Sequence, residues 1–212
     1  MWGVVPLAKG DIPFVVAIIG RWKYGCGGGS GSGARPSIFQ NTRGEFQNMQ
    51  IKVFTTGGSL DKGYSTRDSD FIVQGPQIGN ILGEANVDFD SDIEALLRKD
   101  SLDLTEEDRD LIAERVAEDP CGRILITHGT DTMAETGRRL ASVAGKTIVL
   151  TGAMQPASFK RTDAPFNVGF ALAALQLLPP GVYLAMNGNL FNPDQARKNM
   201  ELDRFEKASP GA

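Results

Sequence analysis

The sequence predicts a three-layer α/β fold, doubly wound around a parallel sheet. Short apolar segments rich in β-branched residues alternate with segments whose apolar residues recur at helical spacing between residues 51 and 186. Two of the expected strands also end in glycine-containing loops that carry hydroxyl side chains. Strands separated by helices imply right-handed crossovers and a sheet covered by helices on both faces.

Each element has a local signal. Thr105 and Asp108 resemble a capping box, which indicates that a helix begins there, and Pro120 ends it. The residues of this helix expected to face the core are Leu111, Ile112 and Val116. In chain order, strands are expected at 51–54, 93–97, 124–127, 146–150 and 182–186, and helices at 76–85, 105–119, 132–144 and 166–178.

Composition narrows the class of protein. With 212 residues, 41% of them hydrophobic and 23% charged, the chain has the size and composition of a soluble protein with one main domain. The net charge of −4 without a basic stripe argues against nucleic acid as a partner, and no apolar run is long enough for a membrane span. Cys26 and Cys121 lack the spacing of a metal site or a disulfide framework, so we expect a reducing, cytoplasmic location and a half-buried structural thiol at Cys121.

The first 48 residues do not share the alternating pattern. Their longest apolar run is short and follows acidic and proline residues rather than basic ones, which argues against a secretion signal, and residues 24–35 are rich in glycine and serine. We therefore expect 1–48 to be a flexible extension or an over-long gene start, with a regulatory arm as the alternative. The domain itself is expected at 49–206, beginning at Met49, with a short tail at 207–212.

The two hydroxyl-rich loops indicate one shared site. Thr56-Gly57-Gly58-Ser59 follows the first strand, and His128-Gly129-Thr130-Asp131-Thr132 follows the strand at 124–127. In open α/β sheets, ligands bind beyond the carboxyl ends of the strands, where both loops would project. Either loop alone would be weak evidence, since glycine pairs after strands are usually ordinary turns.

These motifs, with Lys146-Thr147-Ile148-Val149-Leu150-Thr151-Gly152-Ala153-Met154, recur in this order in the L-asparaginase family, which the chain resembles from about residue 49 to 206. Common bacterial members add a second, smaller domain, so the chain is most similar to short, single-domain asparaginase-like proteins. The resemblance implies the fold of the asparaginase N-terminal domain and hydrolysis of L-asparagine to L-aspartate and ammonia, without cofactor or metal.

The resemblance implies that Ser59 is the nucleophile, at a position where the family normally has threonine. Serine keeps the hydroxyl but loses the methyl group that restricts the rotamer. Gly58 lets the backbone approach the substrate closely. A tyrosine on a mobile loop contacts the nucleophile in the family; Tyr64 is the best match here, and Phe71, which has no hydroxyl, competes for that position.

A second group of residues is implied to relay protons, with Asp131 bridging Thr130 and Lys146. A lysine ammonium beside a carboxylate can orient the carboxylate and tune the acidity of the hydroxyl that the carboxylate contacts. Lys146 precedes its strand, however, and would have to reach back toward the site; alternatively it is a solvated lysine. Asp131 could also cap the helix at 132.

The resemblance further implies substrate contacts at Gly58, Ser101 and Gly129. Ser101 resembles the family serine that holds the α-carboxylate, although it could be an ordinary loop serine. His128, the single histidine, argues against a His-based metal centre and is expected to shape its loop rather than act as a base.

The sequence thus predicts an amidohydrolase that acts on free L-asparagine as a homodimer or a higher homo-oligomer. Two alternatives stay open. One is a sensor or degenerate homologue that binds asparagine-like ligands without turnover, and the other is a subunit that supplies ammonia to a partner amidotransferase. The sequence does not distinguish asparagine from glutamine as the preferred substrate.

Overall fold

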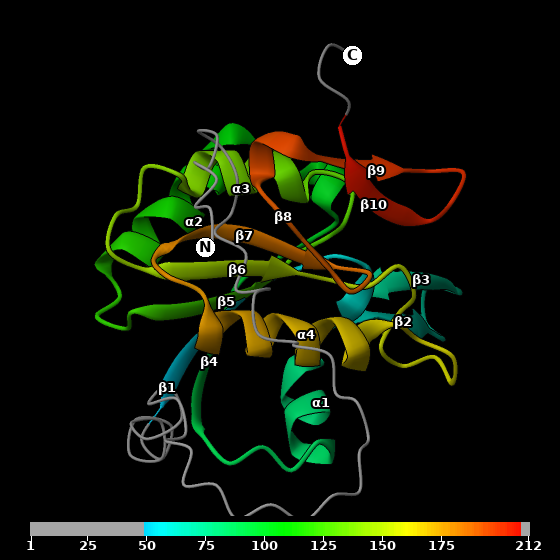
Figure 1. The fold of residues 1–212 in the computed structure, drawn as a ribbon. Coiled ribbons are helices and arrows are strands. Elements are labelled where there is room, and N and C mark those ends of the chain that lie inside the picture. The colour runs from blue at the N-terminus through cyan, green and yellow to red at the C-terminus, as the bar shows by residue number, and fades with distance from the viewer. Residues whose placement is uncertain (1–48, 209–212) are drawn as a thin grey trace, which may run out of the picture. The chain divides into compact units, whose positions relative to one another are not determined.

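A six-stranded sheet lies at the centre of residues 49–208, the part of the chain that this computed structural model describes (Figure 1). The strand order is β4–β1–β5–β6–β7–β8, and all neighbours are parallel except the β7–β8 pair. The strands are β1 (Gln50–Gly57), β4 (Asp90–Lys99), β5 (Arg123–Thr127), β6 (Thr147–Thr151), β7 (Gly181–Met186) and β8 (Asn189–Phe191). The expected parallel sheet is confirmed, with an antiparallel edge strand added.

Helices cover both faces of this sheet. One face carries α1 (Ile78–Glu84) and α4 (Ala164–Leu177), and the other carries α2 (Glu106–Glu118) and α3 (Met133–Leu140) (Figure 1). The three-layer α/β prediction is therefore confirmed. The expected extension at 1–48 lies outside the described residues, as does the end of the tail.

The crossovers differ in hand. The chain passes from β1 to β4 in one direction and then returns across β1 to β5, β6 and β7. Given the faces that the helices occupy, the crossovers through α1, α2 and α3 share one hand and the β6–α4–β7 crossover has the opposite hand. The expectation of uniformly right-handed crossovers is therefore wrong. Before α4 begins, the segment 152–163 reaches the loop after β1, where the Ala157 N–H donates to the Leu60 carbonyl at 3.1 Å, and this detour lets the chain change face.

The core lies between the sheet and its helices. Its fully buried large side chains include Phe54, Ile112, Ile124, Ile126, Met133, Leu140, Ile148 and Leu150. The capping box of α2 is confirmed: Thr105 Oγ1 accepts from the Asp108 N–H, and Asp108 accepts from the Thr105 N–H. Leu111 was expected in the core but is 40% exposed, because it lies one residue before Ile112, on the outer side of α2.

Two hairpins project beyond the central sheet. The first consists of β2 (Lys62–Ser65) and β3 (Asp70–Val73), and the second of β9 (Ala196–Asn199) and β10 (Arg204–Lys207). A short 3-10 helix precedes each hairpin: η2 (Ser59–Asp61) comes before β2, and η4 (Pro193–Gln195) comes before β9. A third, η3 (Ser101–Asp103), follows β4. None of the helices within 49–208 is long and apolar enough to cross a membrane.

Candidate active site

The carboxyl ends of β1 and β5 flank the point where the chain reverses its direction across the sheet. From β1 the chain goes to β4 on one side, and from β4 it crosses to β5 on the other. Connections that leave neighbouring strands in opposite directions open a crevice between them, where ligands of α/β proteins usually bind. The loops at 56–59 and 128–132 both lie at this carboxyl edge of the sheet, where the sequence predicts the site.

Glycines allow these loops to touch. Gly58 has φ 80°, and a Cβ there would lie 2.3 Å from the Gly129 Cα. A Cβ on Gly129 would lie 2.6 Å from Ser101 Oγ. Both positions therefore exclude a side chain for steric reasons. The structure thus brings together the three residues expected to contact substrate.

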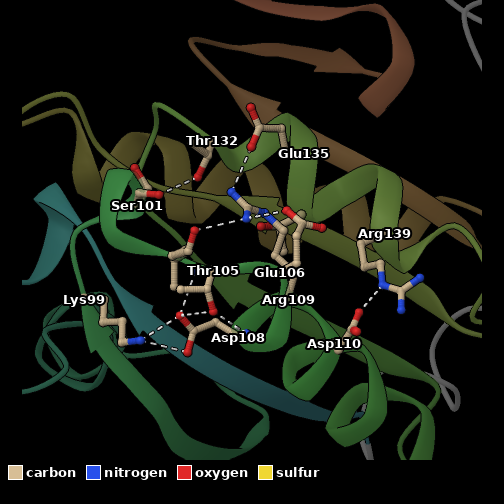
Figure 2. Close-up of polar contacts among 12 residues, drawn as sticks. Lys99, Ser101, Thr105, Glu106, Asp108, Arg109, Asp110, Thr132, Glu135 and Arg139 are labelled. Carbon is tan, nitrogen blue, oxygen red and sulfur yellow. Dashed lines mark hydrogen bonds and ion pairs between the residues drawn. The ribbon is translucent and has the colours of Figure 1, made fainter.

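Ser101 is bonded directly to the loop after β5. Its Oγ accepts from the Asp131 N–H at 3.3 Å, and its carbonyl accepts from Thr132 Oγ1 at 2.7 Å. Figure 2 shows the Ser101–Thr132 contact beside the guanidinium of a buried arginine, Arg109. Ser101 is itself 1% exposed, so its hydroxyl is held in place rather than free on a loop.

Arg109 joins the Ser101 loop to the helix that follows the Thr130 loop. Its guanidinium donates to the Leu104 carbonyl at 3.1 Å, to Glu106 at 2.9 Å and to Glu135 on α3 at 2.8 Å (Figure 2). The Arg109 side chain is 6% exposed. A planar guanidinium with several fixed donors suits this bridging position better than a lysine would.

Lys198, on β9, is the cation that contacts the predicted relay residues. Its Nζ lies 2.8 Å from Thr130 Oγ1 and 2.7 Å from Asp131 Oδ1, so one ammonium donates to both side chains. The Lys198 side chain is 15% exposed, and that of Asp131 is 26% exposed. Partial burial strengthens this ion pair relative to one at a fully solvated surface.

Lys146 does not join this group, which corrects the prediction made from the sequence. Its Nζ donates to the carbonyls of Asp119 and Cys121, the latter at 3.2 Å. Lys146 precedes β6, so it lies at the amino edge of the sheet, whereas Thr130 lies beyond the carboxyl edge. A strand of this length spans roughly 15 Å, more than a lysine side chain can reach.

Sequence reasoning missed Lys198, but the chain contains a signal for it. β7 ends at the same edge of the sheet as β5, so the residues after Met186 must begin near the crevice. A polar strand in that position can carry a lysine into the site. The strand β9 itself, Ala196–Asn199, has no glycine motif and no strong apolar period that would have drawn attention to it.

Ser59 and Tyr64 lie on consecutive elements after β1. Ser59 is half-buried at the start of η2, directly after Gly58. Tyr64 lies on β2 opposite Phe71 on β3, and their rings pack edge to face with centroids 5.6 Å apart. Both candidates for the family's loop tyrosine position therefore lie on one hairpin. Within the described residues no hydrogen bond joins Tyr64 to Ser59, and the Tyr64 side chain is 55% exposed.

His128 is a buried, neutral residue that shapes its loop. Nδ1 lies 2.7 Å from the Gly129 carbonyl and Nε2 lies 2.8 Å from Thr136 Oγ1. Because a carbonyl can only accept, Nδ1 carries the proton and Nε2 accepts from threonine. Burial and, to a lesser extent, the nearby Arg109 charge lower the pKa of His128 to about 4, against the opposing effect of the bond to the Gly129 carbonyl. Its ring nitrogens are both engaged within the loop and helix, which supports the expected structural role.

Comparisons with known proteins give one consistent result for the family of this chain. The family profile described as "Asparaginase, N-terminal" matches residues 50–210. An L-asparaginase of Thermococcus kodakarensis is 32% identical over 148 residues, covering 65% of this chain and 44% of that protein. The glutaminase-asparaginase of Acinetobacter glutaminasificans is 32% identical over 114 residues, covering 51% and 33%.

Solved structures give the same result. The thermostable L-asparaginase from Thermococcus kodakarensis superposes with a TM-score of 0.66 at 28% identity, covering 75% of this chain and 51% of that one. L-asparaginase I from Vibrio cholerae gives a TM-score of 0.63 at 28% identity, covering 76% and 51%. The chain thus spans about half the length of these relatives, or less. Because the matching profile extends over most of its residues, the chain belongs to the asparaginase family.

Proposed function

We propose that the protein is an amidohydrolase that converts free L-asparagine to L-aspartate and ammonia. The observation that carries the proposal is the position of Lys198, whose ammonium bonds to both Thr130 and Asp131 beside the crevice. Placed there, the cation fixes the Asp131 carboxylate and the Thr130 hydroxyl oxygen relative to each other through two charge-assisted hydrogen bonds. The proposed relay is therefore Thr130–Asp131–Lys198.

In the proposed reaction, the Ser59 hydroxyl attacks the side-chain carboxamide carbon of asparagine. The hydroxyl proton passes to the departing nitrogen, directly or through neighbouring groups, and ammonia leaves an ester on Ser59. Water then attacks the ester carbonyl, and aspartate and the free hydroxyl are regenerated. Backbone N–H groups of the glycine loops would stabilise the oxyanion in both steps.

The remaining predicted residues have supporting roles in this proposal. Tyr64 would approach the nucleophile from its hairpin, and Ser101, with the main chain at Gly58 and Gly129, would hold the substrate. Ser101 is well placed for this, because its hydroxyl is already fixed against the Asp131 N–H. Ser59 is the preferred nucleophile because it is only half-buried, whereas Thr130 is 2% exposed.

An amide panel with ammonia detection tests the proposal. Purified protein is incubated with asparagine, glutamine and their D-forms, and a mock purification serves as the blank. Catalytic ammonia release from L-asparagine, above that from the other amides, is expected. Glutamine preferred over asparagine would keep the reaction and change the substrate, a distinction that matters because one relative is named a glutaminase-asparaginase.

A ligand sensor is the second candidate, and the observation that favours it is that, within the described residues, Tyr64 is exposed and makes no hydrogen bond to Ser59. Calorimetry with L-asparagine separates the two. Saturable binding of asparagine without ammonia release would establish a sensor and would contradict the amidohydrolase proposal.

A further inference from the structure

Asp61 is a buried acidic residue that the proposed reaction does not use. It ends η2, two residues after Ser59, and is 1% exposed. Burial raises the pKa of its carboxyl to about 6, while the bond from the Gln77 N–H and the charge of Arg98 act in the opposite direction. A carboxylate is seldom buried to this extent without a specific function for its oxygen atoms.

The hydrogen bonds of Asp61 hold together three segments of chain. Its N–H donates to the Gly58 carbonyl at 3.2 Å, its carbonyl accepts from the Gln74 N–H at 2.8 Å, and its Oδ1 accepts from the Gln77 N–H at 2.8 Å. Gln77 is the N-cap residue of α1. The β2–β3 hairpin leaves the domain at Lys62 and returns at Gln74, so both of its ends are fastened at this one residue.

Further contacts fix the first strand of the hairpin. Lys62 Nζ lies 2.6 Å from Asp100, the residue before Ser101, and the Lys62 carbonyl accepts from Ser158 Oγ at 3.2 Å. By contrast, Tyr64 and Phe71 farther along the hairpin are exposed. The hairpin therefore has a fastened base, and beyond it the exposed Tyr64 is supported by ring packing with Phe71, which in turn packs on Phe159.

We infer that Asp61 is a positioning residue for the proposed amidohydrolase, because its Oδ1 and main chain set the direction in which the hairpin leaves the nucleophile loop. This inference rests on the proposed function. Without Oδ1, the Gln77 N–H at the start of α1 loses its partner and the hairpin's return strand is fastened to η2 only through Gln74. Tyr64 is then presented to Ser59 over a wider range of positions.

Three variants of the full chain test the inference. Asp61→Ala removes the acceptor, Asp61→Asn keeps an acceptor oxygen of the same shape, and Asp68→Ala removes an exposed carboxylate in the turn of the same hairpin, where it accepts from Ser65 Oγ. Thermal melts confirm that each variant is folded. Amide hydrogen exchange over residues 62–77 and the kinetics of ammonia release are then compared with the unmodified protein.

In Asp61→Ala, we expect exchange at Gln77 and along the hairpin to rise about tenfold, as for the loss of one buried hydrogen bond. The kcat/KM should fall roughly 10- to 100-fold, with a rise in KM as well as a fall in kcat, because reacting groups are misplaced. Asp61→Asn and Asp68→Ala should both stay within about threefold of the unmodified protein in exchange and in kcat/KM.

The inference is overturned if Asp61→Ala has unchanged hairpin exchange, or if Asp61→Asn loses as much protection as Asp61→Ala. Should Asp61→Ala fail to fold, Asp61→Ser replaces it, and Asp61→Asn must still show hairpin exchange like that of the unmodified protein. Absence of ammonia release from every sample would contradict the proposed function and with it the catalytic part of the inference. The exchange measurement, which needs no turnover, would still decide whether Asp61 positions the hairpin.

Discussion

Ser59 is the residue on which the proposed chemistry depends most. It lies where β1 gives way to η2, after two glycines with positive φ of 99° and 80°. That sharp turn projects the hydroxyl away from the strand without committing the side chain to the core. A change at this position should therefore affect chemistry much more than stability.

Ser59→Ala is expected to abolish ammonia release while the fold is retained, because it removes the attacking oxygen and little packing. The loss should be roughly four to six orders of magnitude in kcat, as when other covalent hydrolases lose their nucleophile. Ser59→Thr should preserve activity, and Ser65→Ala, which removes a hydroxyl from the neighbouring hairpin, is the matched control. Near-normal kinetics in folded Ser59→Ala would exclude Ser59 as the nucleophile.

Asp61 should give stability a distinct dependence on pH. Its folded pKa of about 6 lies above the ordinary value of 3.8, so the folded state is penalised by the buried charge above pH 6. The penalty is lost as the pH falls through 6 toward 4, and it amounts to about 3 kcal/mol at most. Asp61→Asn carries no such charge. Urea unfolding should show the variant gaining more stability over the unmodified protein at pH 8 than at pH 4.5, where roughly a third of the penalty remains. An equal difference at both pH values would contradict this.

At the scale of elements, the sequence predicts the layered core better than the parts that complete the site. The helices α2 and α4 and the parallel strands carry apolar periods, a capping box and β-branched runs, which are local signals. The hairpins at 62–73 and 196–207 have few apolar residues, and β9 is held by its pairing with β10 and by the Lys198 contacts. Because those contacts are made across many residues of chain, no local pattern reveals them.

Lys146 is the opposite case, a residue to which a sequence motif assigns a role in the site although it lies at the other edge of the sheet. The family resemblance places a lysine in the relay, and Lys146 stands inside a matching motif. The edge of the sheet at which a residue lies is decided by strand direction, however, and Lys146 precedes β6 whereas Lys198 follows β7. Strand direction could have been used at the sequence level to reject Lys146 in favour of a later lysine.

Arg109 joins two helices, and its removal should destabilise the protein. Arg109→Met deletes the bonds to the Leu104 carbonyl and to Glu135, and we expect a fall of about 2–4 kcal/mol in the free energy of unfolding. Arg115→Met is the control on the same helix, because Arg115 is 44% exposed in its contacts with Glu94 and Glu118, and it should cost under about 1 kcal/mol. Urea denaturation checks both values, and equal losses would refute the bridging role.

At the scale of the whole molecule, an exposed apolar cluster adjoins the site. Tyr64, Phe71 and Phe159 form a chain of edge-to-face rings with centroids 5.6 and 5.4 Å apart, and all three are exposed. Such a patch beside a crevice is suited to contact with another protein surface. Closed two-fold symmetry is the commonest way in which identical chains associate.

We therefore predict that the working protein is a homo-oligomer, most simply a dimer. Light scattering across a dilution series, run in parallel with ammonia release, should show activity per chain falling as the oligomer dissociates. An active monomer at low concentration would instead mean that the β2–β3 hairpin alone is sufficient to cover the crevice.

The most direct test of the whole account compares the two lysines. Lys198→Met and Lys146→Met make the same change in length and charge, at opposite edges of the sheet. With the relay at Thr130, Asp131 and Lys198, Lys198→Met should lower kcat by about 100-fold or more, in keeping with the usual contribution of acid–base groups. Lys146→Met should retain kcat within about threefold. The opposite pattern, with Lys198→Met active and Lys146→Met inactive in folded protein, would contradict the proposed site.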